Sequence, residues 1–118
     1  MYFWKGGFWL DTLLAKAEVF NDYIKELANW IRQEGDDFIY TERLPECGEG
    51  VRDAICDAKN HPDRLQEDFS EATRLLDEFR SIMNLLVVYG ILTEIQSRPL
   101  LSACGEIKDN ISVEKKGR

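Results

Sequence analysis

The strongest constraint in this sequence is the spacing of its apolar residues between positions 65 and 86. They follow one another in alternating steps of four and three: Leu65, Phe69, Ala72, Leu76, Phe79, Met83 and Leu86. An α-helix brings residues at this spacing onto one face, and the alternation is typical of a helix packed along its whole length. Gly90 follows, a residue type that commonly ends helices. We therefore predict a long amphipathic helix over residues 63–89.

Three further segments have apolar residues at helical spacing, over residues 8–33, 43–59 and 94–112. In the second of them, Gly48 and Gly50 are unfavourable, because an interior glycine costs about 1 kcal/mol relative to alanine. In the last, Thr93 and Gln96 have the spacing of a capping box. Pro99 follows closely, however, and favours a proper helix start near residues 97–98.

No segment shows the alternation of a β-strand, and 118 residues correspond to one domain. We therefore predict an all-α fold with a single domain over residues 1–118. Four amphipathic helices with short connections favour an antiparallel up-down four-helix bundle.

The helix over residues 63–89 has more apolar residues than one bundle core requires. Leu75, Ile82 and Val88 belong to a second apolar row beside the first. A helix with so wide an apolar face is often buried on two sides, as in an oligomer. We therefore predict a homo-oligomer with these three residues in the subunit interface.

Charge restricts the choice of partner. The chain has 15 Lys and Arg against 22 Asp and Glu, for a net charge of −7. Such an excess disfavours nonspecific nucleic-acid binding by the whole surface, since that affinity comes from neutralising phosphates. Acidic residues concentrate between Glu34 and Glu49, and this segment is either a binding site for a basic partner or a solvated connection.

Residues that perform chemistry are few. Cys47, Cys56 and Cys104 are an odd set, and the first ten residues have no export signal, which favours reduced thiols in the cytoplasm. The spacing of Cys47, Cys56 and His61 matches no common zinc pattern. Cys56 and His61 lack an orienting partner for nucleophilic catalysis. We predict no enzyme activity, metal, cofactor, small-molecule substrate or membrane span.

The second half of the chain resembles a family of small four-helix bundles. This family includes the accessory variability determinant (Avd) of diversity-generating retroelements and the proteins encoded by intervening sequences of 23S rRNA genes. The resemblance rests on residues 55–58, on Phe69, Ala72, Leu76 and Glu78, on residues 89–93, and on Leu100, Leu101, Glu106 and Ile107. It implies a non-enzymatic cytosolic bundle, commonly a homopentamer. In the Avd branch it implies association with a reverse transcriptase and its template RNA.

The family usually places several basic residues along its second helix, but here that helix is acidic. A basic patch for RNA or a partner would have to use Lys59, Arg64, Arg74, Arg80, Lys108, Lys115 and Lys116. The leading hypothesis is an Avd-like accessory protein that supports retroelement cDNA synthesis. The alternative is an acidic protein–protein interaction module, similar to an antitoxin or an inhibitor, with no role in nucleic-acid binding.

Overall fold

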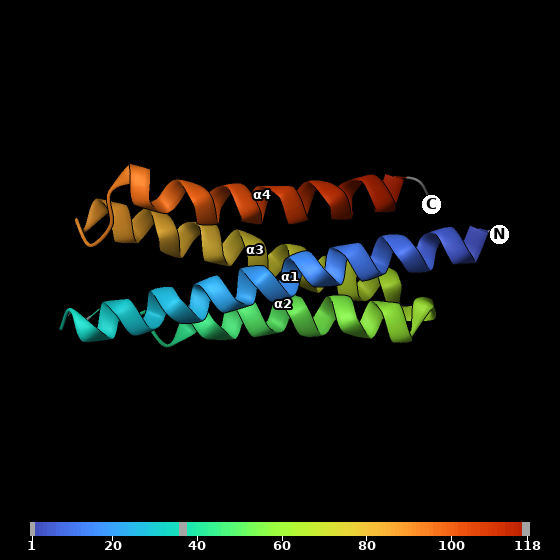
Figure 1. Ribbon diagram of the computed structural model, residues 1–118, viewed down its shortest axis with the longest axis horizontal. Coiled ribbons are helices and arrows are strands. Elements are labelled where there is room, and N and C mark those ends of the chain that lie inside the picture. Colours follow the sequence, from blue (N-terminus) through green and yellow to red (C-terminus); the bar gives the residue numbers. More distant parts are fainter. Residues whose placement is uncertain (1, 36–37, 117–118) are drawn as a thin grey trace.

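The structure is a computed structural model that describes the backbone of residues 2–35 and 38–116 and the side chains of residues 10–35 and 38–112. Within these ranges it has four α-helices and no strand (Figure 1). The helices are α1 (Tyr2–Gln33), α2 (Arg43–Asn60), α3 (Leu65–Val88) and α4 (Glu94–Lys116), with a short 3-10 turn, η1 (Pro62–Arg64), between α2 and α3. The prediction of an all-α bundle is confirmed. α1 begins earlier and α4 ends later than predicted.

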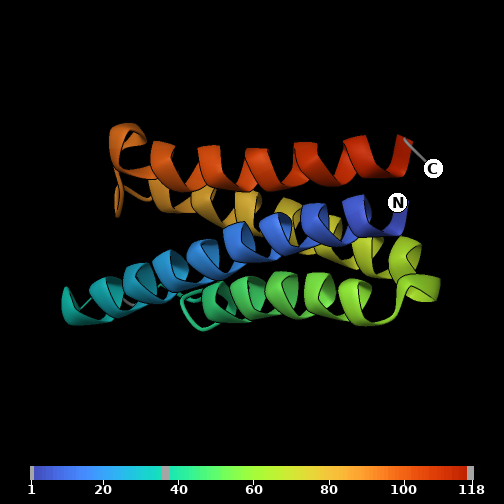
Figure 2. The same ribbon diagram turned by 45° about the vertical axis from the view of Figure 1, so that its right-hand side comes forward.

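The bundle is elongated, with extents of 51 × 21 × 19 Å, and both termini lie at the same end (Figure 1). α2 packs closely against α1 and α3, while α4 lies in looser contact with the same two helices. The turned view shows α1 between α4 and α2 at the front of the bundle (Figure 2). No described helix is long and apolar enough to cross a membrane.

The core consists of the apolar stripes that the spacing predicts. The largest fully buried side chains include Phe20 of α1 and Phe69, Phe79 and Met83 of α3. The rings of Phe20 and Phe79 meet edge to face with their centroids 5.0 Å apart, a favourable aromatic geometry. This contact joins α1 to α3 across the middle of the bundle.

The glycines of α2 give its neighbours room to approach. A Cβ atom at Gly50 would lie 2.5 Å from Cδ1 of Leu75, and one at Gly48 would lie 3.2 Å from the Cα of Asn21. The local cost of glycine in a helix is therefore offset by close packing of α1 and α3 on α2.

This packing corrects part of the predicted subunit interface. Leu75 and Ile82 are only 5% and 4% exposed within one chain. These two side chains are therefore too buried to contact a second copy of the chain. Leu75 lies against Gly50, where an ordinary side chain would have excluded it. Val88 is 75% exposed, and the structure leaves its predicted role in an interface untested.

Both ends of the α3–α4 connection follow sequence signals. Gly90 has φ = 77°, and the amide of Ile91 donates to the carbonyl of Leu86, as in a helix-ending Schellman motif. Thr93 and Gln96 form the predicted capping box, with reciprocal hydrogen bonds of 2.9 and 3.1 Å.

The capping box sets the start of α4 at Glu94, which is the start of the predicted range 94–112, and the alternative of a proper start near residues 97–98 is wrong. Pro99 then lies inside the helix. A proline there removes a hydrogen bond and crowds the carbonyl four residues earlier. The first turn of α4 correspondingly steps away from the axis of the rest of the helix (Figure 1).

Candidate functional site

Most of the predicted basic patch is neutralised by carboxylates of the same chain. Lys59 pairs with Asp11, and Lys108 donates to Asp77 at 2.6 Å. Arg74 is hydrogen-bonded to Glu71 at 3.0 Å. The pairing raises the pKa of Arg74 and lowers that of Glu71, in each case mainly through this hydrogen bond. These cations are therefore poorly available for phosphate groups.

The other predicted cations are more dispersed. The Nε atom of Arg64 lies 4.0 Å from both Asp57 and Glu67. Arg80 is exposed and has no ion pair within the described part of the chain. The side chains of Lys115 and Lys116 lie outside the described residues. Arg80 is therefore the predicted cation whose described side chain has no carboxylate partner.

The acidic segment between Glu34 and Glu49 is also largely paired. Glu42 binds Arg32 at 3.0 Å, and Glu49 lies 3.4 Å from Lys25. Glu46 binds Arg43, which also forms a two-pronged ion pair with Glu78 of α3. Residues 36 and 37 lie outside the described residues. Among the described residues of this segment, Glu42, Glu46 and Glu49 are paired, and Glu34 is exposed without an ion pair.

Unpaired acidic side chains occur along the outer side of α1. Glu18, Asp22 and Glu26 are exposed, and none of them has an ion pair within the described residues. They recur every four residues and therefore lie in a row along the helix. Glu26 lines a hollow between α1 and α4, whereas Glu18 and Asp22 line a hollow between α1 and α2 that also includes Arg52, Asp53 and Cys56.

The face of α1 that turns toward α4 carries an apolar groove. It contains two hollows between α1 and α4. The first, about 320 Å³, is lined by Thr12, Ala15, Lys16, Val19, Phe20, Ala103, Glu106 and Ile107. The second, about 410 Å³, is lined by Tyr23, Glu26, Leu27, Trp30, Leu92, Gln96, Pro99 and Leu100.

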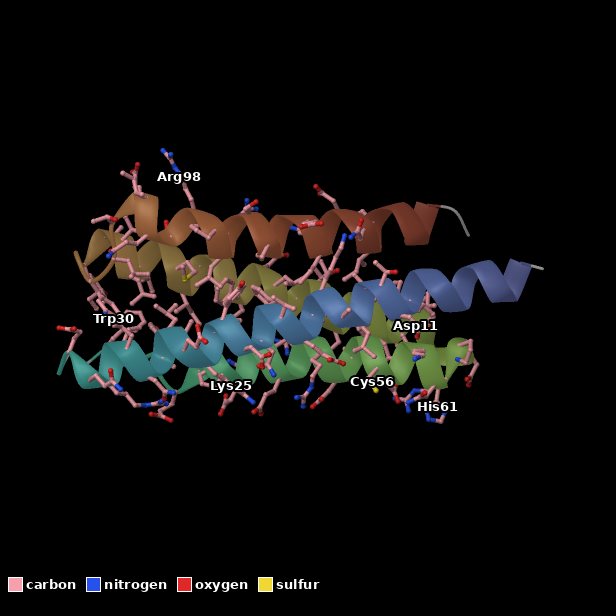
Figure 3. All side chains as sticks on the ribbon, viewed as in Figure 1. Asp11, Lys25, Trp30, Cys56, His61 and Arg98 are labelled. Atoms are coloured by element: carbon pink, nitrogen blue, oxygen red, sulfur yellow. The ribbon has the colours of Figure 1, made fainter. Side chains whose placement is uncertain are left out.

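The groove has an exposed apolar wall and few charges. Val19 and Tyr23 are 50% and 53% exposed, although both are large side chains. Lys16 and Glu106 form an ion pair of 2.8 Å between α1 and α4 at the first hollow. In the second hollow Glu26 is the only charged side chain. Trp30 lies between α1 and the start of α4 at this end of the bundle (Figure 3).

A second group of exposed apolar side chains lies where α3 ends and α4 begins. Val88, Tyr89 and Ile95 are 75%, 61% and 74% exposed. The ring of Tyr89 lies 6.0 Å from that of Phe38, which is buried under this end of the bundle. This group is more scattered than the α1–α4 groove, and no hollow lies beneath it among those that the structure describes.

The thiols and the histidine do not form a catalytic arrangement. The Cys56 thiol accepts a hydrogen bond from Asn60 at 3.7 Å, and His61 lies 3.9 Å from Asp57. Cys56 and His61 lie on the outer side of the end of α2 (Figure 3). Burial raises the pKa of Cys47 and of Cys104 to about 11, so both thiols are protonated at neutral pH.

Two carboxyl groups meet where α2 passes into α3. Asp68 is 9% exposed, and its Oδ2 atom has no hydrogen-bond donor within the described residues. Burial raises its pKa to about 6, with further increases from a hydrogen bond to Asp57 and from its charge. No group of three Asp, Glu, His or Cys side chains in the described part of the chain could hold a metal ion.

The α1–α4 groove has a signal in the sequence that the predicted interface does not include. Ala15, Val19, Tyr23 and Trp30 form a second apolar row on α1, at steps of four, four and seven residues. The predicted interface instead uses the second row of the helix over residues 63–89, in which Leu75 and Ile82 are buried. Comparisons with protein-family models, with curated proteins and with solved structures find no match.

Proposed function

We propose that this chain acts by binding a basic protein and performs no chemistry itself. We take its bundle to have the antiparallel up-down topology that the sequence predicts. The distribution of charge carries this proposal. Four of the predicted RNA-contacting cations already have carboxylate partners. In contrast, Glu18, Asp22 and Glu26 have no cationic partner within the described residues.

Physical chemistry supports a protein rather than RNA as the partner. Nucleic-acid affinity requires cations that can release counterions from phosphates. A cation already held by a carboxylate must give up that partner first. Glu26, an unpaired carboxylate in a mainly apolar hollow, offers both charge complementarity and apolar contact to a basic protein, and Glu18 and Asp22 add negative charge on the same helix. We place the protein in the cytoplasm, because all three cysteines are free thiols.

The test compares two probes on the full chain at low and moderate salt. One is a structured RNA hairpin, and the other is a helical peptide rich in arginine and leucine. We expect the peptide to bind, with an affinity that falls as salt rises, and the RNA not to bind at low salt. Salt-sensitive RNA binding without peptide binding would overturn the proposal.

A second candidate is the Avd-like accessory protein that docks on a reverse transcriptase or its RNA. Two observations favour it. Val88, Tyr89 and Ile95 offer exposed apolar surface for a second copy. Arg80 and Arg98 have no ion pair within the described residues, and Arg98 points away from the bundle (Figure 3). Light scattering after size-exclusion chromatography separates the candidates, since this one requires a mass several times that of the 13.7 kDa chain.

A further inference from the structure

The second hollow of the α1–α4 groove combines three side chains that suit one kind of ligand. Tyr23, Glu26 and Trp30 line it from α1, at steps of three and four residues that place them on one side of the helix. Two aromatic faces beside a carboxylate are a favourable environment for an organic cation. The rest of the lining is mainly apolar, with Leu92, Pro99 and Leu100. Such a hollow suits a side chain with an aliphatic stem and a cationic end.

Arginine fits this description better than lysine. Its planar guanidinium stacks on aromatic rings and binds a carboxylate through two parallel hydrogen bonds. Glu26 has no ion pair within the described residues, so an incoming guanidinium displaces no internal cation. The hollow volume of about 410 Å³ leaves room for a long side chain.

The first hollow suits a different residue. Val19, Phe20, Ala103 and Ile107 make its lining mainly apolar, and its one cation, Lys16, is already paired with Glu106. An apolar side chain placed there would bury surface without leaving a charge unpaired.

The distance between the hollows matches the geometry of a helix. The α1 residues that line the second hollow lie on average about ten positions after those that line the first. At 1.5 Å per residue this is ~15 Å, close to three helical turns. Residues eleven positions apart lie on the same face of a helix, ~16 Å from each other. A helix lying along the groove would therefore present one residue of such a pair to each hollow.

We propose that the groove holds a helix of the basic partner, with an arginine in the second hollow and an apolar side chain in the first. This inference rests on the proposed function and names its binding site. Glu26, which lines the second hollow and has no ion pair within the described residues, complements a cationic side chain of that helix. A second copy of this chain is a poorer occupant, since each copy has a net charge of −7.

The direct test uses synthetic helical peptides of about 16 residues, long enough for four turns. Each carries one arginine and one leucine eleven positions apart, with lysine and alanine elsewhere, and two peptides place the arginine at opposite ends. Binding is followed through the fluorescence of Trp30 in a chain in which Trp4 and Trp9 are replaced by phenylalanine. We expect one of the two peptides to bind more tightly and to change the emission of Trp30.

Matched variants then locate the site. Glu26→Gln is expected to weaken the better peptide about tenfold, because a charge-assisted hydrogen bond is lost. Tyr23→Ser is expected to weaken it several-fold, because one aromatic face is lost. The controls are Glu67→Gln and Tyr89→Ser, which remove an exposed carboxylate and an exposed aromatic ring outside the groove. Both controls should leave the affinity unchanged.

Changes in the peptide test the ligand chemistry. Replacing its arginine with citrulline, which has the same shape but no charge, should weaken binding about as much as Glu26→Gln does. Replacing the arginine with lysine should weaken binding less. Circular dichroism confirms that every variant keeps its helices. Because all four substituted side chains are exposed, we expect each variant to fold.

Two results would overturn this inference. If the peptides bind but the groove and control variants respond alike, the partner lies on another surface, and the proposed function survives without this site. If the chain is a dimer that Tyr23→Arg separates and Val88→Arg does not, the groove belongs to a second copy. Failure of every basic peptide to bind would instead remove the proposed function itself.

Discussion

Replacing Asp68 with asparagine is expected to stabilise the fold at neutral pH and to leave its stability unchanged near pH 4. Asp68 lies in the first turn of α3 with 9% of its surface exposed. Its carboxyl group faces Asp57, with His61, Arg64 and Glu67 as the other charged or titratable groups nearby. An ionised carboxylate in this place is poorly solvated and lies beside a like charge.

The pKa of Asp68 gives the size and sign of the effect. Burial first, and then Asp57, raise it from an ordinary 3.8 to about 6. A rise of about 2 in pKa corresponds to about 3 kcal/mol. Because the folded-state pKa is the higher one, this contribution is fully present below pH 3.8 and is lost as the pH rises through 6. Asparagine has no charge to desolvate, and its amide can donate to Asp57 at every pH.

The assay is urea unfolding with linear extrapolation, from pH 4 to pH 7.5. Both chains carry His61→Gln, which removes the imidazole that lies 3.9 Å from Asp57. At pH 7.5 we expect Asp68→Asn to raise the free energy of unfolding by about 1–3 kcal/mol. The control is Asp63→Asn, which removes an exposed carboxylate from η1. Equal stabilisation at both ends of the pH range, or none at pH 7.5, would refute the reasoning.

Three further predictions concern stability. Gly48→Ala should lower the free energy of unfolding by about 1–3 kcal/mol, because the new Cβ meets the backbone of α1 at 3.2 Å. Gly105→Ala, whose Cβ would have nothing within 4 Å, should raise the free energy of unfolding by about 0.5–1 kcal/mol. Urea titrations of the two variants must show changes of opposite sign. Thr93→Ala should cost about 1 kcal/mol through loss of the capping box, measured by thermal unfolding with the exposed Ser102→Ala as control. Glu78→Gln should cost about 1 kcal/mol at low salt and less at high salt, since it breaks the ion pair with Arg43; a loss that does not depend on salt would contradict an electrostatic origin.

Apolar spacing was sufficient to predict the helices, because burial follows helical periodicity directly. The stripe from Leu65 to Leu86 is buried at every one of its predicted positions. Local signals also predicted the cap at Gly90 and the capping box at Thr93. Where local signals conflicted, as between the capping box and Pro99, the residue pattern alone could not decide which one would set the start of the helix. The two hydrogen bonds of the box were enough to start α4 before the proline.

Charge was harder to predict, because an ion pair depends on which helices become neighbours. Lys108 and Asp77 are 31 residues apart in the sequence, and Lys59 and Asp11 are 48 apart. Each pair nevertheless forms an ion pair between two neighbouring helices. A count of basic residues therefore overstates the positive surface that a partner meets. The same argument applies to the acidic segment, where Arg32 and Lys25 of α1 neutralise Glu42 and Glu49.

The position of the exposed apolar surface was also hard to predict, because it too depends on which helices become neighbours. Two helices have a second apolar row, and periodicity alone cannot say which row a neighbouring helix will cover. On α3 the row is covered at Leu75 and Ile82, with Leu75 in the space beside Gly50 of α2, which has no side chain, while Val88 stays exposed. On α1 the row around Tyr23 stays open, because α4 lies in looser contact and its first turn steps away at Pro99. Side-chain size and a proline in the neighbouring helices thus decide which face remains available for a partner. For this reason, substitutions along α1 test function more directly than substitutions along the more regular stripe of α3.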